Sequence, residues 1–224
     1  MASTTTPLEM NRPLPSWTLV LWWVLANAVG FGMVGAGFHF PGDFRTDLAA
    51  FEWGPALFGL AIGAVTGVLV GLLHWIVFRR HLARAGWWVL TTALGIGVTH
   101  GLNDAMPYSA MSAALIMISS GFFIGLIQWL HVRGQVKPAA WWIAASAASW
   151  PIAWLAGLAV VESLGLFDVR WSAGVGFQQH GLFSVVFGLV YGAITGITLL
   201  LMLRRRQGQR TATLQYSADN QFSN

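Results

Sequence analysis

Residues 71–90 read GLLHWIVFRRHLARAGWWVL. The stretch ends one apolar run, crosses a short basic segment with Arg79, Arg80 and Arg84, and enters a second apolar run at Trp87. A short basic segment between two apolar runs is typical of a cytoplasmic connection between transmembrane helices. This stretch therefore predicts a helical membrane protein, and related arrangements recur along the chain.

The composition agrees with a membrane protein. Of the 224 residues, 56% are hydrophobic and only 9% are charged, whereas soluble domains carry about 25% charged residues. Because so few charged residues cannot cover a water-facing surface, most of the protein surface must face lipid. The chain has no cysteine, which excludes disulfides, thiolate metal sites and a cysteine nucleophile.

Six apolar segments can be read, at residues 17–38, 55–78, 86–103, 110–132, 139–161 and 181–203. Five reach the roughly 20 residues that cross the hydrocarbon core, and the third is short. Backbone polar groups in lipid must be paired within the segment, and no period-two alternation is present, so the segments are predicted to be helices. We expect an all-α bundle of six transmembrane helices over residues 17–204, a leader at 1–16 and a disordered tail at 205–224.

The charges predict the orientation of this bundle. Only Arg45 and Arg170 fall on one side, and ten basic residues fall on the other: Arg12, Arg79, Arg80, Arg84, Arg133, Lys137, Arg204, Arg205, Arg206 and Arg210. Lys and Arg near span ends mark the cytoplasmic side, so both chain ends are expected there. The basic residues lie where anionic lipid attracts them, which favours membrane contact over nucleic-acid binding.

A threefold repeat organises the six segments into hairpins at about 17–80, 86–133 and 139–204. Tryptophan pairs at 22–23, 87–88 and 141–142 lie early in the odd-numbered segments, and the even-numbered segments carry glycines four residues apart before a basic end. All three hairpins start and end on the same side, so the repeats are parallel. Inverted repeats are common in alternating-access transporters, so this pattern disfavours that class.

The pattern in residues 71–90 resembles that of uncharacterised multi-pass bacterial membrane proteins of hairpin-repeat type. The resemblance implies a location in the bacterial inner membrane. It implies no particular activity.

The glycines of the even-numbered segments are predicted to pack helices together. Residues four apart share a helix face, and a face without side chains lets another backbone approach closely. An alternative is a groove on these faces for a lipid tail, a carotenoid or a tetrapyrrole, or for a partner helix. The glycines are Gly59, Gly63, Gly67, Gly71, Gly121, Gly125, Gly188, Gly192 and Gly196.

The tryptophans are expected mainly at the membrane interfaces, as aromatic belts, with both members of the pairs 87–88 and 141–142 at the inner boundary. Pro151 interrupts the helical hydrogen bonding of its segment and marks the best local candidate for a cavity.

Asn27, Thr92 and Ser146 occupy equivalent repeat positions. We expect them to hydrogen-bond between helices around a shared axis.

The candidate ligand-binding residues lie at the outer ends of the segments. Imidazoles at this level can bind a metal or a tetrapyrrole, but no two histidines have the spacing of a metal site on one helix, and no metal site is assigned. Interfacial histidines bonded to backbone or headgroups are the alternative. The candidates are His100, Asn103, Asp104, Glu162, Gln178 and His180.

Ser120-Gly121 and His180-Gly181 resemble the serine and histidine positions of rhomboid-type intramembrane proteases. The resemblance would imply a Ser120–His180 catalytic pair. The family motif is Gly-x-Ser-Gly, however, and Ile118 stands at its first position here.

Three functional hypotheses follow. The leading one is a non-enzymatic accessory, assembly or scaffold subunit, which works with other membrane subunits and holds a lipid or pigment against the glycine faces. The alternative is a small-molecule uptake subunit with a site at the outer candidates and Gln179. A rhomboid-like protease is third.

Overall fold

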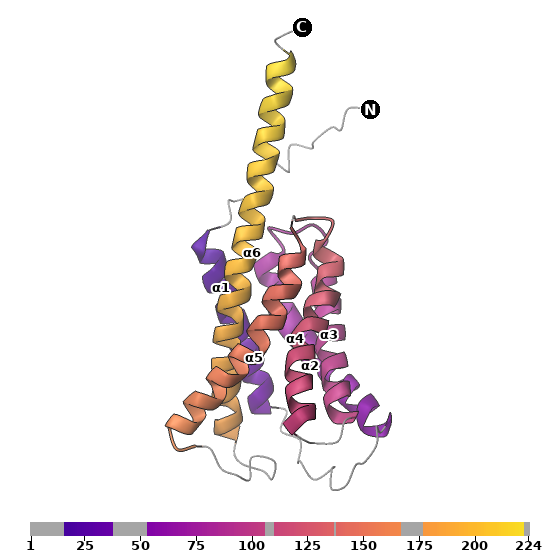
Figure 1. Ribbon diagram of the computed structural model, residues 1–224, viewed down its shortest axis with the longest axis vertical. Coiled ribbons are helices and arrows are strands. Elements are labelled where there is room, and N and C mark those ends of the chain that lie inside the picture. Colours follow the sequence, from indigo (N-terminus) through magenta and orange to yellow (C-terminus); the bar gives the residue numbers. More distant parts are fainter. Residues whose placement is uncertain (1–15, 38–52, 106–109, 137, 167–176, 222–224) are drawn as a thin grey trace.

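The computed structural model describes residues 16–37, 53–105, 110–136, 138–166 and 177–221. The described chain is helical and contains no strand. The helices are α1 (Trp17–Gly37), α2 (Trp53–Phe78), α3 (Trp87–Ala105), α4 (Ala110–Val132), α5 (Ala140–Ser163) and α6 (Phe177–Gln221) (Figure 1).

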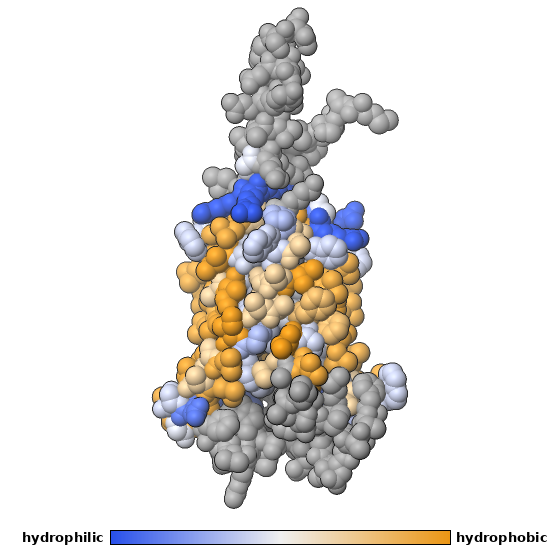
Figure 2. All heavy atoms as spheres, viewed as in Figure 1, coloured by the Kyte–Doolittle hydropathy of each residue, from blue (hydrophilic) through white to orange (hydrophobic). Residues whose placement is uncertain are grey.

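Five of these helices, all except α3, are long and apolar enough to cross a membrane. α3 has 19 residues and includes three threonines and the polar run His100, Asn103 and Asp104, which lowers its hydropathy. The face drawn in Figure 2 shows a broad apolar band, with hydrophilic residues gathered mainly at its upper end. Many large apolar side chains in this band are exposed, for example Leu57 and Leu155, each 63% exposed. This surface suits lipid, and the chain is built as a multi-pass membrane protein.

The described helices form a closed ring. Each helix packs against its neighbours in the sequence, and α6 closes the ring by packing against α1. The start of α1 lies beside the Arg-rich part of α6, because the Arg204 guanidinium sits 6.0 Å from the Trp17 ring centroid. We call this the basic end of the bundle, and the other the opposite end.

The glycine faces show which helices approach most closely. The α2 glycines face α3, the α4 glycines face α5, and the α6 glycines face α1. Each of these helices therefore packs its glycine face onto the first helix of the next predicted hairpin, and the last hairpin packs onto the first. The close contacts of these nine glycines form between the predicted hairpins, whereas Gly157 of α5 approaches Phe183 of α6 within the third one.

Gly67 illustrates how close this approach is. A Cβ atom there would lie 2.5 Å from the Cα of Ala93 and 2.7 Å from the carbonyl oxygen of Thr92. These neighbours are backbone atoms, which cannot turn aside as a flexible side chain can. Only glycine fits at this α2–α3 contact.

The second tryptophan of each pair lies in the core. Trp23, Trp88 and Trp142 are fully buried, and their ring centroids are 5.4–6.1 Å apart in edge-to-face contact. Each indole N–H donates a hydrogen bond to another helix. The acceptors are Thr195 Oγ1 at 2.9 Å, His74 Nδ1 at 3.2 Å and Gln128 Oε1 at 3.0 Å, respectively.

Trp88 and Trp142 therefore do not belong to a lipid-facing aromatic belt, but they pack beside the loop residues Leu82, Ala85 and Val136 at the basic end. Consecutive helix residues point about 100° apart, so a tryptophan pair cannot present both rings to lipid in the same direction. The first members are the exposed ones, with Trp87 56% and Trp141 60% exposed. The second members share a helix face with the small polar residue four positions later, and that spacing could have revealed them.

Those small polar residues, Asn27, Thr92 and Ser146, are all buried. Thr92 makes the expected bond between helices, because its hydroxyl accepts a hydrogen bond from Gln128 Nε2 at 3.1 Å. The Asn27 amide instead donates to the Trp23 carbonyl within α1, at 2.8 Å. The indole groups provide more of the bonding between helices than this triplet does.

α6 differs from the expectation at its C-terminal end. A disordered tail is predicted from residue 205, but the structure continues the helix to Gln221. A helix already nucleated in the membrane extends at little cost, and residues 205–221 contain no proline.

Candidate functional site

A cavity of about 240 Å³ lies between α1, α2, α3, α5 and α6. On α1 its lining begins eight residues after Trp23, roughly 12 Å farther along the helix, so the cavity lies towards the opposite end from the tryptophan cluster. The lining residues are Phe31, Val34, Gly35, Ile62, Thr66, Ile96, His100, Trp150, Trp154, His180, Ser184 and Phe187.

Aromatic rings form one wall of this cavity. Phe31, Trp150 and Phe187 come from three helices and meet edge to face, with centroid distances of 4.8–6.1 Å. Such contacts hold rings in fixed orientations. The wall therefore offers a preformed surface to a flat or elongated apolar group.

Pro151 lies in α5 between the two cavity tryptophans. Proline has no N–H to donate to the preceding turn, which favours a bend in the helix, and Figure 1 shows α5 turning away from the bundle axis in its second half. Trp150 and Trp154 are four residues apart and share a helix face. Trp150 and Trp154 both line the cavity, which agrees with the sequence-based expectation of a cavity beside Pro151.

A few polar groups interrupt the apolar lining. They are His100, His180, Ser184 and Thr66. The Thr66 side chain is 1% exposed, and its hydroxyl has no hydrogen-bond partner among the described residues. A buried polar group without a partner costs about 1–3 kcal/mol, so a hydrogen-bonding ligand in the cavity would relieve this cost.

The structure brings together two of the six predicted ligand-binding residues, because His100 and His180 both line the cavity. Asp104 lies near His100, since a Cβ on Gly59 would meet both the Asp104 carboxylate and the His100 carbonyl oxygen. The Asn103 amide donates to Asp104 Oδ1 at 3.1 Å, in an exposed position.

Of the two remaining candidates, Glu162 and Gln178, only Glu162 has a described side chain. Glu162 is exposed near the end of α5 and does not line the cavity. Gln178 belongs to α6, but its side chain lies outside the described residues.

Phe31, Thr66 and Phe187 also line the cavity, but they are not among the ligand-binding residues predicted from the sequence. Thr66 directly precedes the predicted packing glycine Gly67. This position beside a helix contact is the one sequence feature that could have indicated its burial. The aromatic wall had no such signal, because apolar rings suit a lipid-facing surface equally well.

All nine predicted packing glycines lie against a neighbouring helix. In each case an added Cβ would come within 3.0 Å of a neighbouring atom. At these nine positions the glycine faces lie against other helices of the same chain.

The protease-like pair is not assembled. Ser120 is buried in α4, and its hydroxyl donates to the Ile116 carbonyl of the same helix at 2.5 Å. α4 contributes no residue to the cavity that His180 lines. A serine nucleophile needs its base within hydrogen-bond reach, and this arrangement does not provide one.

Among the described residues, no group of three histidine, aspartate or glutamate side chains is placed to hold a metal ion. Comparison with known proteins adds no relative: no protein-family model, curated protein or solved structure matches the chain.

Proposed function

We propose that this chain is a non-enzymatic accessory subunit of the bacterial inner membrane that holds a small, largely apolar molecule in its central cavity. The observation that supports this most directly is the combination of an aromatic wall with imidazole and hydroxyl groups in one cavity. Ligand sites typically pair apolar walls with a few polar groups that fix orientation.

The size of the cavity narrows the class of molecule. Its volume of about 240 Å³ lies below the roughly 300–1,000 Å³ typical of pockets for drug-sized ligands. The end of a lipid tail or one end ring of a carotenoid suits this volume better than a whole tetrapyrrole. The polar end of the molecule would hydrogen-bond to Thr66, His100 or His180.

Occupancy can be tested by filling the cavity. Ile62→Trp should exclude the bound molecule, because Ile62 lines the cavity. Ile76→Trp is the matched control, since Ile76 lies on the same helix and is 53% exposed to the surroundings. Native mass spectrometry and absorption spectroscopy of protein purified in mild detergent should show a stoichiometric molecule in wild type and Ile76→Trp only. Wild-type protein without any such molecule would contradict the proposal.

A small-molecule uptake subunit is the second candidate, and the nearness of Asp104 to His100 of the cavity favours it. A carboxylate is suited to a polar or cationic solute, but not to a hydrocarbon. Loss of the bound molecule in Asp104→Ala, together with a water-soluble identity, would support uptake. An apolar molecule that is retained in Asp104→Ala would support the accessory role.

The proposal includes six membrane crossings as three parallel hairpin repeats, with both chain ends in the cytoplasm. The basic end supports this orientation through the charge rule. α3 is proposed to cross despite its polar residues, because Thr92 and Thr99 are buried against other helices and not exposed to lipid.

The crossing of α3 can be tested with single cysteines, because the chain has none of its own. Asn103→Cys and Gly86→Cys lie at exposed positions at the end of α3 and just before its start. A membrane-impermeant maleimide should label Asn103→Cys in intact cells, and Gly86→Cys only after permeabilisation. Labelling of both from the same side would show that α3 does not cross.

A further inference from the structure

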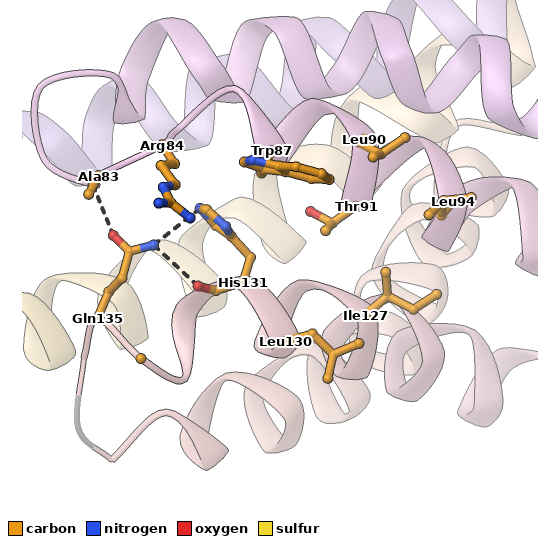
Figure 3. Close-up of a pocket in the computed structure, with 11 residues that line it drawn as sticks. Ala83, Arg84, Trp87, Leu90, Thr91, Leu94, Ile127, Leu130, His131 and Gln135 are labelled. Carbon is orange, nitrogen blue, oxygen red and sulfur yellow. Dashed lines mark hydrogen bonds between the residues drawn. The ribbon is translucent and has the colours of Figure 1, made fainter.

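A second and larger pocket of about 590 Å³ lies near the basic end, between α3 and α4 and the loops beside them. Figure 3 shows its lining. The residues are Ala83, Arg84, Trp87, Leu90, Thr91, Leu94, Ile127, Leu130, His131, Gly134 and Gln135.

The pocket is polar at one end and apolar along its length. Arg84, His131 and Gln135 gather at one end in Figure 3, and the walls continue along α3 to Leu94 and along α4 to Ile127. From Trp87 to Leu94 the pocket follows about two helix turns, roughly 10 Å. No lining residue is acidic, so the charge of Arg84 is not neutralised by the pocket itself.

The mouth of the pocket is held by a link between the two loops. Gln135 Oε1 accepts a hydrogen bond from the backbone N–H of Ala83 at 2.8 Å, and Gln135 Nε2 donates to the His131 carbonyl at 3.2 Å. The backbone beside Arg84 is thereby tied to the end of α4. The basic group and the apolar walls are held in one arrangement.

Arg84 also has an unusual backbone conformation. Its φ is 53°, in the left-handed region, and among the described residues it is the only non-glycine with positive φ. Side chains with a Cβ are disfavoured there, and such strain is often retained where the geometry serves function. A glycine would suit the turn better but could not supply the guanidinium.

From these observations we propose that the pocket binds one anionic phospholipid of the surrounding bilayer, with its phosphate at Arg84 and His131 and an acyl chain along Leu90, Leu94 and Ile127. Guanidinium groups pair well with phosphate oxygens, and basic pockets between membrane helices on the cytoplasmic side suit anionic headgroups. This site is separate from the central cavity and does not depend on what that cavity holds.

The test uses the full chain in mild detergent, titrated with phosphatidylglycerol or phosphatidylcholine and observed by native mass spectrometry. Wild type should retain one phosphatidylglycerol in preference to phosphatidylcholine. Arg84→Gln should weaken this retention about fivefold, the factor expected for one basic residue near an anionic lipid. Arg80→Gln, an exposed arginine of the same loop outside the pocket, should retain the lipid like wild type.

Two further variants separate binding from folding. Leu94→Trp should narrow the apolar part and reduce retention, whereas Leu115→Trp, at an exposed position of α4 outside the pocket, should not. Arg84→Gly should lose the lipid while its melting temperature stays equal or rises, because the left-handed strain is removed.

Three outcomes would overturn the proposal. They are wild-type retention in Arg84→Gln, a large fall in melting temperature in Arg84→Gly, and displacement of the lipid by inorganic phosphate. The first would remove Arg84 from the site, the second would make Arg84 structural, and the third would indicate a general phosphate site.

Discussion

Trp142→Ala is expected to lower the free energy of unfolding by about 3 kcal/mol, at the lower end of the range for tryptophan truncation in a core. The indole is fully buried against Trp23 and Trp88. Its loss leaves an unfilled space and removes the hydrogen bond to Gln128. The lower end applies because lipid adds no hydrophobic driving force between helices, so lost packing and hydrogen bonding make up the effect.

The neighbouring Trp141 provides the matched control. It is 60% exposed, so Trp141→Ala should change stability by less than about 0.5 kcal/mol. Unfolding in mixed micelles with increasing SDS, followed by circular dichroism, measures both variants. Equal destabilisation by the two variants would mean that the tryptophan cluster is not the core of the basic end.

Gly67→Ala is expected to destabilise the protein by about 2–3 kcal/mol, the upper part of the range for overpacking. A single methyl group would meet the Ala93 Cα and the Thr92 carbonyl oxygen, so α2 and α3 would have to separate. This separation would weaken the close contacts along the whole glycine face.

Gly54→Ala is the control in the same helix. A Cβ at Gly54 would meet nothing within 4 Å, so this substitution should leave the SDS midpoint nearly unchanged. If Gly67→Ala behaved like Gly54→Ala, the close packing of α2 onto α3 would not be a source of stability.

The helices were largely predictable, because an apolar run in a mostly apolar chain has few alternatives to a helix in lipid. The predicted segments 110–132 and 139–161 agree closely with α4 and α5. The structure continues α6 to Gln221, beyond the predicted end of the last segment, because a polar composition alone does not stop a helix that is already formed.

The candidate site was predictable in part. His100 and His180 could be placed near the ends of their segments by counting residues, but Phe31, Thr66 and Phe187 could not be selected. The depth of a residue follows from its place along a helix, whereas its contacts depend on how the helix is rotated about its axis.

The sequence by itself determined the helical class, the apolar surface, the basic end and the glycine faces suited to close contact. Only the tertiary structure decided which helix each glycine face meets, and that Trp23, Trp88 and Trp142 meet at the centre. A glycine face indicates that a backbone approaches closely but carries no information about which one. That choice depends on how side chains from all six helices fill the ring.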